Sequence, residues 1–213
     1  MGIQERRERE RETRRNQIMA AAKRVFSSKG FNRSTMEDIA NDAELSPGTL
    51  YLYFKNKEEL YASLSVEALQ TLTKRLEEVN EKNDLNPEEK LMALTESLYA
   101  SYEANPLTFI NMFHLQSSIT LKNLSPELMS TIKKLSGSTL GACAKVFEEG
   151  VNEGFFIDNH PVALADIFWG LFSGIVLWEE SKRIIDYDKD YLKETLEIAF
   201  RIFGRGIRKG QNS

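Results

Sequence analysis

Apolar residues recur every three or four positions along almost the whole chain, the spacing that places them on one face of an α-helix. The first such face, over residues 14–28, consists of Ile18, Ala21, Ala22, Val25 and Phe26. Gly30 follows it, where a glycine commonly ends a helix. No stretch has the strict alternation of a half-buried strand. The sequence therefore predicts an all-α protein of about nine helices.

Three short helical signals lie end to end within residues 33–61. Thr35 can cap the first helix, because its hydroxyl accepts a backbone N–H that would otherwise lack a partner, and Asp38 favours a capping box. After a tight turn, Ser46 can cap a second helix, over residues 47–54. Two short helices joined by such a turn predict a helix-turn-helix, whose second helix can enter the major groove of DNA.

The second helix of this pair carries side chains suited to DNA. Gly48 would let the backbone come close to a phosphate or a base edge, Thr49 offers a hydroxyl and a methyl group, and two tyrosines carry hydroxyls at a reach that suits phosphates. The starts of helices also attract phosphate. The predicted DNA-binding residues are Thr35, Ser46, Pro47, Gly48, Thr49, Tyr51, Tyr53, Lys55 and Lys57.

The same part of the chain resembles the DNA-binding domain of the TetR family of bacterial transcriptional repressors. The resemblance covers roughly residues 14–64, and beyond it the likeness is one of size and helix count. The positions that agree in register are Ala21, Ala22, Phe26, Gly30, Phe31, Ser34, Thr35, Ile39, Ala40, the run Ser46–Tyr51, Tyr53, Phe54, Lys57 and Leu60. The resemblance implies a homodimer that binds operator DNA and responds to a small-molecule effector.

Two domains follow from this interpretation. Residues 1–60 are predicted to form an N-terminal three-helix, helix-turn-helix DNA-binding domain, and residues 61–213 a C-terminal helical domain for ligand binding and dimerisation. The DNA-binding domain begins with a charged arm, residues 1–13, in which arginine and glutamate alternate. Two interpretations of the arm stay open: its arginines reach DNA phosphates or the minor groove, or it is a frayed, solvated helix end with favourable i,i+4 pairs.

The C-terminal domain is rich in bulky apolar residues. In proteins that resemble this one, the corresponding helices enclose an effector pocket. The predicted lining residues are Tyr99, Tyr102, Phe109, Met112, Phe113, His114, Phe147, Phe168, Trp169 and Phe172. A cavity of this kind suits an apolar or amphipathic molecule, such as an acyl chain or a hydrophobic drug-like compound. The alternative is that these residues form a packed core.

The last two predicted helices, residues 161–183 and 188–207, are apolar over more than one face. A helix that is apolar over so wide an arc must be covered on two sides. A second copy of the chain could cover one side through a four-helix interface about a two-fold axis. The alternative is a monomer whose core uses both arcs. The predicted interface residues are Leu171, Gly174, Ile175, Trp178, Leu196, Ala199, Phe200 and Phe203.

Charge and cysteine content agree with a cytoplasmic DNA-binding protein. The net charge is −4, but the N-terminal quarter is basic and the rest acidic, as expected if one end meets phosphate. Cys143 is the only cysteine and cannot form an internal disulfide. The charged N-terminus is unlike a signal peptide. The most apolar stretch, residues 162–178, is short for a membrane span and contains Asp166, so we expect a buried helix and no membrane partner.

We find no sign of an enzyme. Neither His114 nor His160 has a metal-type partner three or four residues away, and no phosphate-binding glycine loop or nucleophile elbow is present. We therefore predict no catalytic residues, no metal and no cofactor. The predicted function is a TetR-like repressor that binds a near-palindromic operator as a dimer and is released by a small apolar or amphipathic ligand. The alternative is a constitutive DNA-binding protein whose helical body binds a protein partner.

Overall fold

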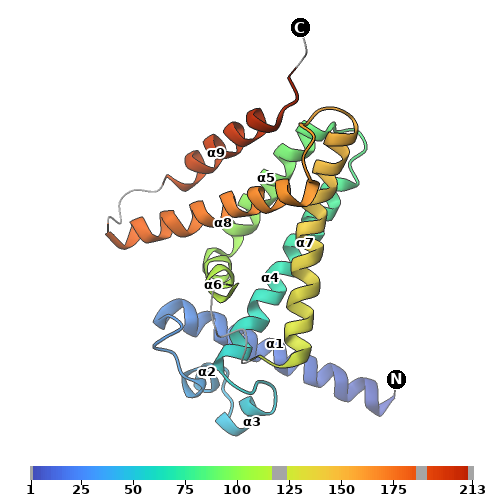
Figure 1. Ribbon diagram of the computed structural model, residues 1–213. Helices are drawn as coiled ribbons and strands as arrows, with labels where there is room; N and C mark the ends of the chain where they lie inside the picture. The colour runs from blue at the N-terminus through green and yellow to red at the C-terminus, as the bar shows by residue number, and fades with distance from the viewer. Residues whose placement is uncertain (1, 117–123, 186–190, 211–213) are drawn as a thin grey trace. The chain divides into compact units, whose positions relative to one another are not determined.

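The computed structural model describes residues 2–116, 124–185 and 191–210, and helices dominate this part of the chain (Figure 1). The prediction of an all-α fold with an N-terminal helix-turn-helix is confirmed. One isolated β-bridge joins Phe156 to Arg208. The helices are α1 (Ile3–Lys29), α2 (Met36–Asp42), α3 (Pro47–Tyr51), α4 (Lys57–Asn80), α5 (Pro87–Ala104), α6 (Pro106–Gln116), α7 (Pro126–Asn152), α8 (Pro161–Ile185) and α9 (Leu192–Ile207).

The chain divides into two compact units. The first consists of the described residues of Met1–Ser65 and Ser118–Met129, and the second of those of Val66–Ser117 and Ser130–Ser213. The division falls inside helices α4 and α7, so each of these helices has residues in both units. The assignment of residues 1–60 and 61–213 to separate functional domains stays a prediction.

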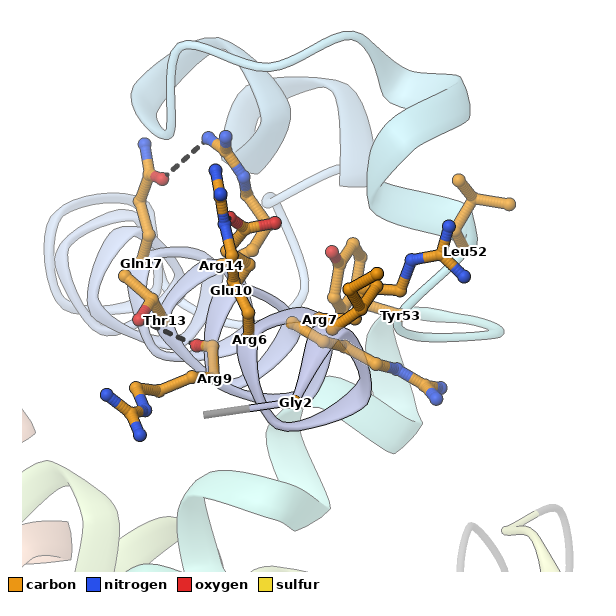
Figure 2. Close-up of a pocket in the computed structure, with 12 residues that line it drawn as sticks. Gly2, Arg6, Arg7, Arg9, Glu10, Thr13, Arg14, Gln17, Leu52 and Tyr53 are labelled. Carbon is orange, nitrogen blue, oxygen red and sulfur yellow. Dashed lines mark hydrogen bonds and ion pairs between the residues drawn. The ribbon is translucent and has the colours of Figure 1, made fainter.

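In the first unit, α1 is longer than its apolar pattern indicated, because the charged arm continues the helix back to Ile3. The carboxylate of Glu5 accepts the backbone N–H of Gly2 at 3.0 Å and so closes the start of the helix. Arg6 and Glu10 form an i,i+4 ion pair at 2.9 Å, and Arg14 donates to the side chain of Gln17 at 2.9 Å (Figure 2).

The apolar face of α1 packs into a small core with α2, α3 and the start of α4. Its centre is a triangle of rings: Phe31 lies 5.7 Å from Phe26 and 4.4 Å from Tyr61, centroid to centroid. Leu50 and Phe54 are buried, as their i,i+4 spacing predicts. Burial also raises the pKa of the Tyr61 phenol above its ordinary value.

Helix α3 is shorter than the predicted 47–54. It ends at Tyr51, because the next N–H groups bond three residues back, Leu52 to Thr49 at 3.2 Å and Tyr53 to Leu50 at 3.0 Å. Such bonds tighten the last turn of a helix. Phe54 therefore reaches the core from a turn rather than from the helix itself.

The core of the second unit is aromatic. Helix α5 contacts α6 and α9, and α8 contacts α6 and α9. Phe168 of α8 packs on Phe200 of α9 at 4.7 Å and on Phe147 of α7 at 5.9 Å. A buried charge accompanies this core: the ammonium of Lys90, whose side chain is 4% exposed, bonds to the carboxylate of Glu149 at 2.7 Å. Pairing of this kind offsets the cost of burying a charge.

Helix α8 was predicted to be buried, and this is only partly so. Among the described helices, its Pro161–Arg183 stretch of 23 residues is long and apolar enough to cross a membrane, but a core helix can meet the same criterion. Only 28% of its most apolar part is buried within the chain. Phe168 and Phe172 point into the core, whereas Ile167 and Trp178 are exposed.

A close approach between α7 and the loop after it depends on a glycine. A Cβ atom built on Gly150 would lie 2.1 Å from Cδ2 of the fully buried Phe156 ring. Gly141, in the same helix, has no neighbour within 4 Å of such an atom. Both glycines are helical, but only Gly150 lacks room for a side chain.

We predict that Gly150→Ala lowers the free energy of unfolding by about 1–3 kcal/mol, because the added methyl group overpacks the core against Phe156. The matched control Gly141→Ala should raise it by about 0.5–1 kcal/mol, since alanine is the better helix former where space is open. Urea titration of both variants measures the difference, and equal effects of the two substitutions would contradict the packing argument.

Candidate nucleic-acid interface

Helices α2 and α3 form a helix-turn-helix with a fixed turn. The chain leaves α2 through Glu44, whose backbone adopts the left-handed conformation (φ 54°), and the N–H of Leu45 bonds back to Ala40 at 2.8 Å. The side-chain amide of Gln17 donates to the carbonyl of Ala43 at 2.7 Å, which ties the turn to α1. Sequence reasoning did not find this contact, because the two residues lie 26 positions apart.

Helix α3 is anchored on one side and open on the other. Leu50 is fully buried, whereas Pro47, Gly48 and Tyr51 are exposed and Thr49 is half-buried. A Cβ atom at Gly48 would meet only the Ser46 hydroxyl, at 3.8 Å, so nothing inside the chain requires glycine there. The outer side of α3 thus has room for a partner to approach the backbone closely.

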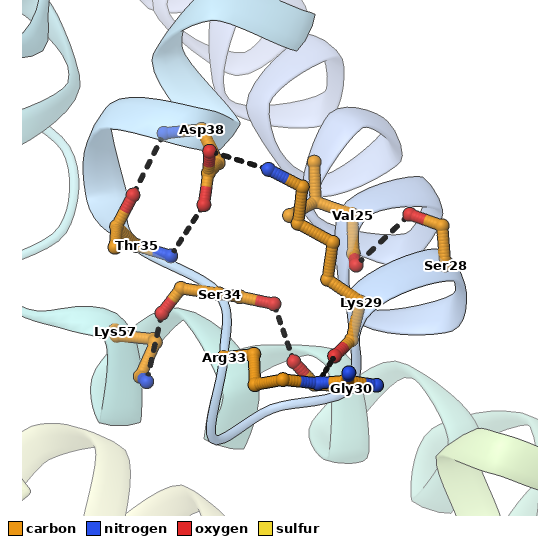
Figure 3. A network of polar contacts seen from close by, with 9 residues as sticks. All are labelled: Val25, Ser28, Lys29, Gly30, Arg33, Ser34, Thr35, Asp38 and Lys57. Carbon is orange, nitrogen blue, oxygen red and sulfur yellow. Dashed lines mark hydrogen bonds and ion pairs between the residues drawn. The ribbon is translucent and has the colours of Figure 1, made fainter.

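Two predicted DNA-binding hydroxyls act as helix caps. Ser46 Oγ accepts the N–H of Thr49 at 3.1 Å and lies 2.9 Å from the Thr49 hydroxyl. Thr35 Oγ1 accepts the N–H of Asp38 at 3.0 Å, and the Asp38 carboxylate accepts the N–H of Thr35, which completes the predicted capping box (Figure 3). Their contacts to DNA stay a prediction.

Asp38 joins this cap to α1. Its carboxylate forms an ion pair with the ammonium of Lys29 at 2.6 Å (Figure 3). Hydrogen bonds from Lys29 and from Thr35 hold the pKa of the Asp38 carboxyl below its ordinary value. The pair is partly exposed, so its main effect is to fix the start of α2 relative to α1 rather than to add much stability.

The two lysines after α3 have different environments. The ammonium of Lys57 donates to the carbonyls of Phe31 and Ser34 at 2.8 and 2.9 Å and lies 4.4 Å from the centre of the Phe31 ring. Lys57 therefore braces the loop before α2, a role that the sequence did not reveal. The side chain of Lys55 is exposed. A phosphate contact by either lysine stays a prediction.

Most of the predicted effector-pocket residues pack against one another. Phe109, Met112, Phe113, Phe147, Phe168 and Phe172 are buried in the core, and Trp169 packs on Phe113 at 5.9 Å. The side chain of His114 lies outside the described part of the structure. Tyr99 and Tyr102 line a pocket of about 320 Å³ together with Glu103, Pro106, Arg183, Leu192 and Lys193. The effector site stays a prediction.

The predicted dimer face needs a correction on α9. Leu196 and Phe200 are buried in the chain's own core, Phe200 against Phe168, and offer no surface to a second copy. On α8, Gly174 and Trp178 are exposed, while Leu171 and Ile175 are half-buried. On α9, Ala199 and Phe203 are half-buried. On these two helices, the exposed apolar residues outside the predicted interface set include Val162, Ile167, Ile198 and Ile202.

The described residues offer no metal site, since they contain no group of three His, Cys, Asp or Glu side chains that could hold an ion. Cys143 is fully buried, and burial raises the pKa of its thiol to about 12. The thiol is therefore protonated at neutral pH and poorly nucleophilic.

Comparison with known proteins agrees with this geometry. Residues 18–64 match the family model described as bacterial regulatory proteins, tetR family. The fatty acid metabolism regulator protein of Bacillus subtilis is 29% identical over 164 residues, which cover 76% of this chain and 81% of that protein.

Solved structures share the fold. The TetR family transcriptional regulator PfmR from Thermus thermophilus superposes with a TM-score of 0.70 at 24% identity, over 88% of this chain and 97% of that one. FadR from Bacillus subtilis, solved in complex with stearoyl-CoA, has a TM-score of 0.67 at 24% identity, over 90% and 98% of the two chains.

A helix-turn-helix braced by a third helix, with its second helix open on one side, defines the protein as a DNA-binding transcriptional regulator. The helix-turn-helix domain, within residues 18–64, is that of the TetR family of bacterial regulatory proteins, and most of the chain is similar in sequence to a regulator of Bacillus subtilis.

We predict that Lys57→Met lowers the free energy of unfolding by about 1–3 kcal/mol, because two carbonyl groups lose a charged donor. The control Lys55→Met removes an exposed ammonium two residues away and should change stability by less than about 0.5 kcal/mol. Denaturant titration of the two variants measures this. If both substitutions cost the same, the Lys57 contacts do not brace the loop.

Proposed function

We propose that this protein is a homodimeric repressor that binds a near-palindromic operator through α3 and leaves it when a small apolar or amphipathic ligand binds the helical body. It would act on DNA in the cytoplasm. The observation that carries the proposal is the orientation of α3: Leu50 fixes its inner side in the core, while Gly48 and Tyr51 face outward.

The outward residues of α3 suit two kinds of contact. Gly48 admits close approach of a phosphate or a base edge, and the exposed hydroxyl of Tyr51 can donate to a phosphate. Thr49 is the candidate for reading bases, since its methyl group can contact thymine. In a dimer, the two α3 helices would enter successive major grooves, with half-sites about 34–36 Å apart or a multiple of that distance.

Dimerisation is supported by the exposed apolar residues of α8 and α9. Trp178 and Ile202 are each 65% exposed, and Ile167 and Ile198 about half exposed. Exposed apolar surface of this kind marks an interaction site. A second copy of the chain covers it by packing the same two helices about a two-fold axis, and Gly170 and Gly174 on α8 allow close helix approach.

The ligand class is inferred from the aromatic body and from the relatives. The second unit buries a cluster of phenylalanine rings whose rearrangement would open an apolar cavity. The similar protein from Bacillus subtilis is named for fatty acid metabolism, and the FadR structure contains stearoyl-CoA. We therefore propose a long-chain acyl compound as the ligand class.

We predict that the purified protein selects a near-palindromic sequence from fragmented genomic DNA and binds it as two chains per operator. Affinity should fall steeply with salt, because phosphate contacts release counterions. Anisotropy titration and light scattering measure affinity and stoichiometry. Replacement of Thr49 by Ala should change the base preference. Absence of salt-sensitive binding to any duplex, with the chain folded, would refute the proposal.

We predict that stearoyl-CoA lowers operator affinity about 5- to 150-fold, the range of a typical allosteric coupling of 1–3 kcal/mol. Free coenzyme A is the control and should leave affinity unchanged, because it lacks the acyl chain. If neither this compound nor a library of apolar metabolites alters DNA binding or thermal stability, the alternative holds: DNA binding is constitutive and the body binds a protein partner.

A further inference from the structure

The N-terminal half of α1 separates charges that alternate in the sequence. In a helix of 3.6 residues per turn, positions three, four and seven apart share a face. Of the four glutamates in this segment, Glu5, Glu8 and Glu12 follow this spacing and lie on one side. Arg7, Arg11 and Arg14 follow it on another side. The acidic and basic residues of this segment nearly cancel in net charge, but the helix gives it one acidic and one basic side.

The basic side lines a groove of about 1030 Å³ (Figure 2). Five arginines of α1 line it: Arg7, Arg11 and Arg14 from the basic side, and Arg6 and Arg9 from other sides of the helix. Leu52 and Tyr53, the two residues that follow α3, line the same groove and lie beside Arg7 in Figure 2. The glutamates of the acidic side are not among the lining residues.

Little negative charge offsets the arginines. Glu10 is the one carboxylate among the described lining residues, and it is paired with Arg6 at 2.9 Å. Within the described residues, no carboxylate lies within ion-pair distance of Arg7, Arg9 or Arg11, and all three side chains are exposed. Their charge is therefore available to a partner.

We propose that this groove binds the phosphate backbone of the operator beside the half-site that α3 contacts, an inference that rests on the proposed function. Two observations favour DNA as the occupant. The groove is continuous with the end of α3 through Leu52 and Tyr53, and its charge is complementary to a polyphosphate. Guanidinium groups also match phosphate oxygens in bidentate geometry.

The geometry of α1 gives these arginines a defined reach. The helix rises 1.5 Å per residue, so Arg7 and Arg14 are separated by about 10 Å along it. Double-stranded DNA carries about one negative charge per 1.7 Å of its axis, so several phosphates fall within that span. Phosphate contacts carry no base information. The groove adds affinity and fixes the position of the protein on the duplex, while α3 determines the sequence that is bound.

The test uses the full-length triple variant Arg7→Gln, Arg9→Gln, Arg11→Gln and the operator fragment that the wild-type protein selects. Each lost phosphate contact should reduce the slope of log affinity against log salt by about 0.9. Two chains bind each operator, so the dimeric variant loses three contacts from each chain and the slope should fall by about 5. Base preference should not change. The matched control is Lys133→Gln, Lys134→Gln, Lys145→Gln, which removes the same charge from exposed positions of α7 and should leave the slope unchanged.

The outcomes separate this inference from the proposed function. If the wild-type protein binds no duplex, the proposed function fails. If it binds and the arginine variant keeps the wild-type slope, only the groove inference fails. An equal loss in both variants would show that net charge acts rather than the groove, and a changed base preference would show base contacts instead of phosphate contacts. A deletion of residues 2–11 should reproduce the loss if the triple variant is unstable.

Discussion

Burial of one side of α3 is the constraint on which the interface depends. A helix of five residues is far too short to be stable alone in water, because nucleation costs more than its few hydrogen bonds return. The burial of Leu50 in the helix and of Phe54 just after it compensates for this cost. The same contacts decide which side of α3 faces out. Its DNA-facing side is thus a consequence of packing.

Polar contacts then fix the segments on either side of α2, which packing alone would not hold in place. Gln17 holds the carbonyl of Ala43, Lys29 holds Asp38 at the start of α2, and Lys57 holds two carbonyls of the preceding loop. The contacts of Gln17 and Lys57 join residues 23 to 26 positions apart, and that of Lys29 joins two consecutive helices. The contacts of Gln17 and Lys57 satisfy backbone carbonyls on either side of α2. Such preorganisation lowers the ordering cost of binding a rigid partner such as duplex DNA.

The sequence predicted local features well and tertiary ones poorly. Thr35 and Ser46 cap their helices as expected, because a cap depends on residues within one turn. The partners of Lys57 lie 23 and 26 positions away and leave no local signal. On α9, periodicity could not show that Leu196 faces the core while Ile202 is exposed, because both residues are apolar. An apolar arc on a helix predicts a buried face, but it does not show whether the chain's own core or a second copy of the chain covers that face.

The length of α1 links the core of the first unit to the arginine-lined groove. One continuous helix supplies the core residues Ile18 and Phe26 at one end and the arginine-lined groove at the other. A disordered arm would lose conformational entropy on binding DNA, which reduces its net affinity. A helical arm has already lost most of that freedom on folding. Alternation of glutamate with arginine allows this, because the i,i+4 pair of Arg6 and Glu10 stabilises the helix while Arg7 and Arg11, on one side of it, form no ion pair within the described residues.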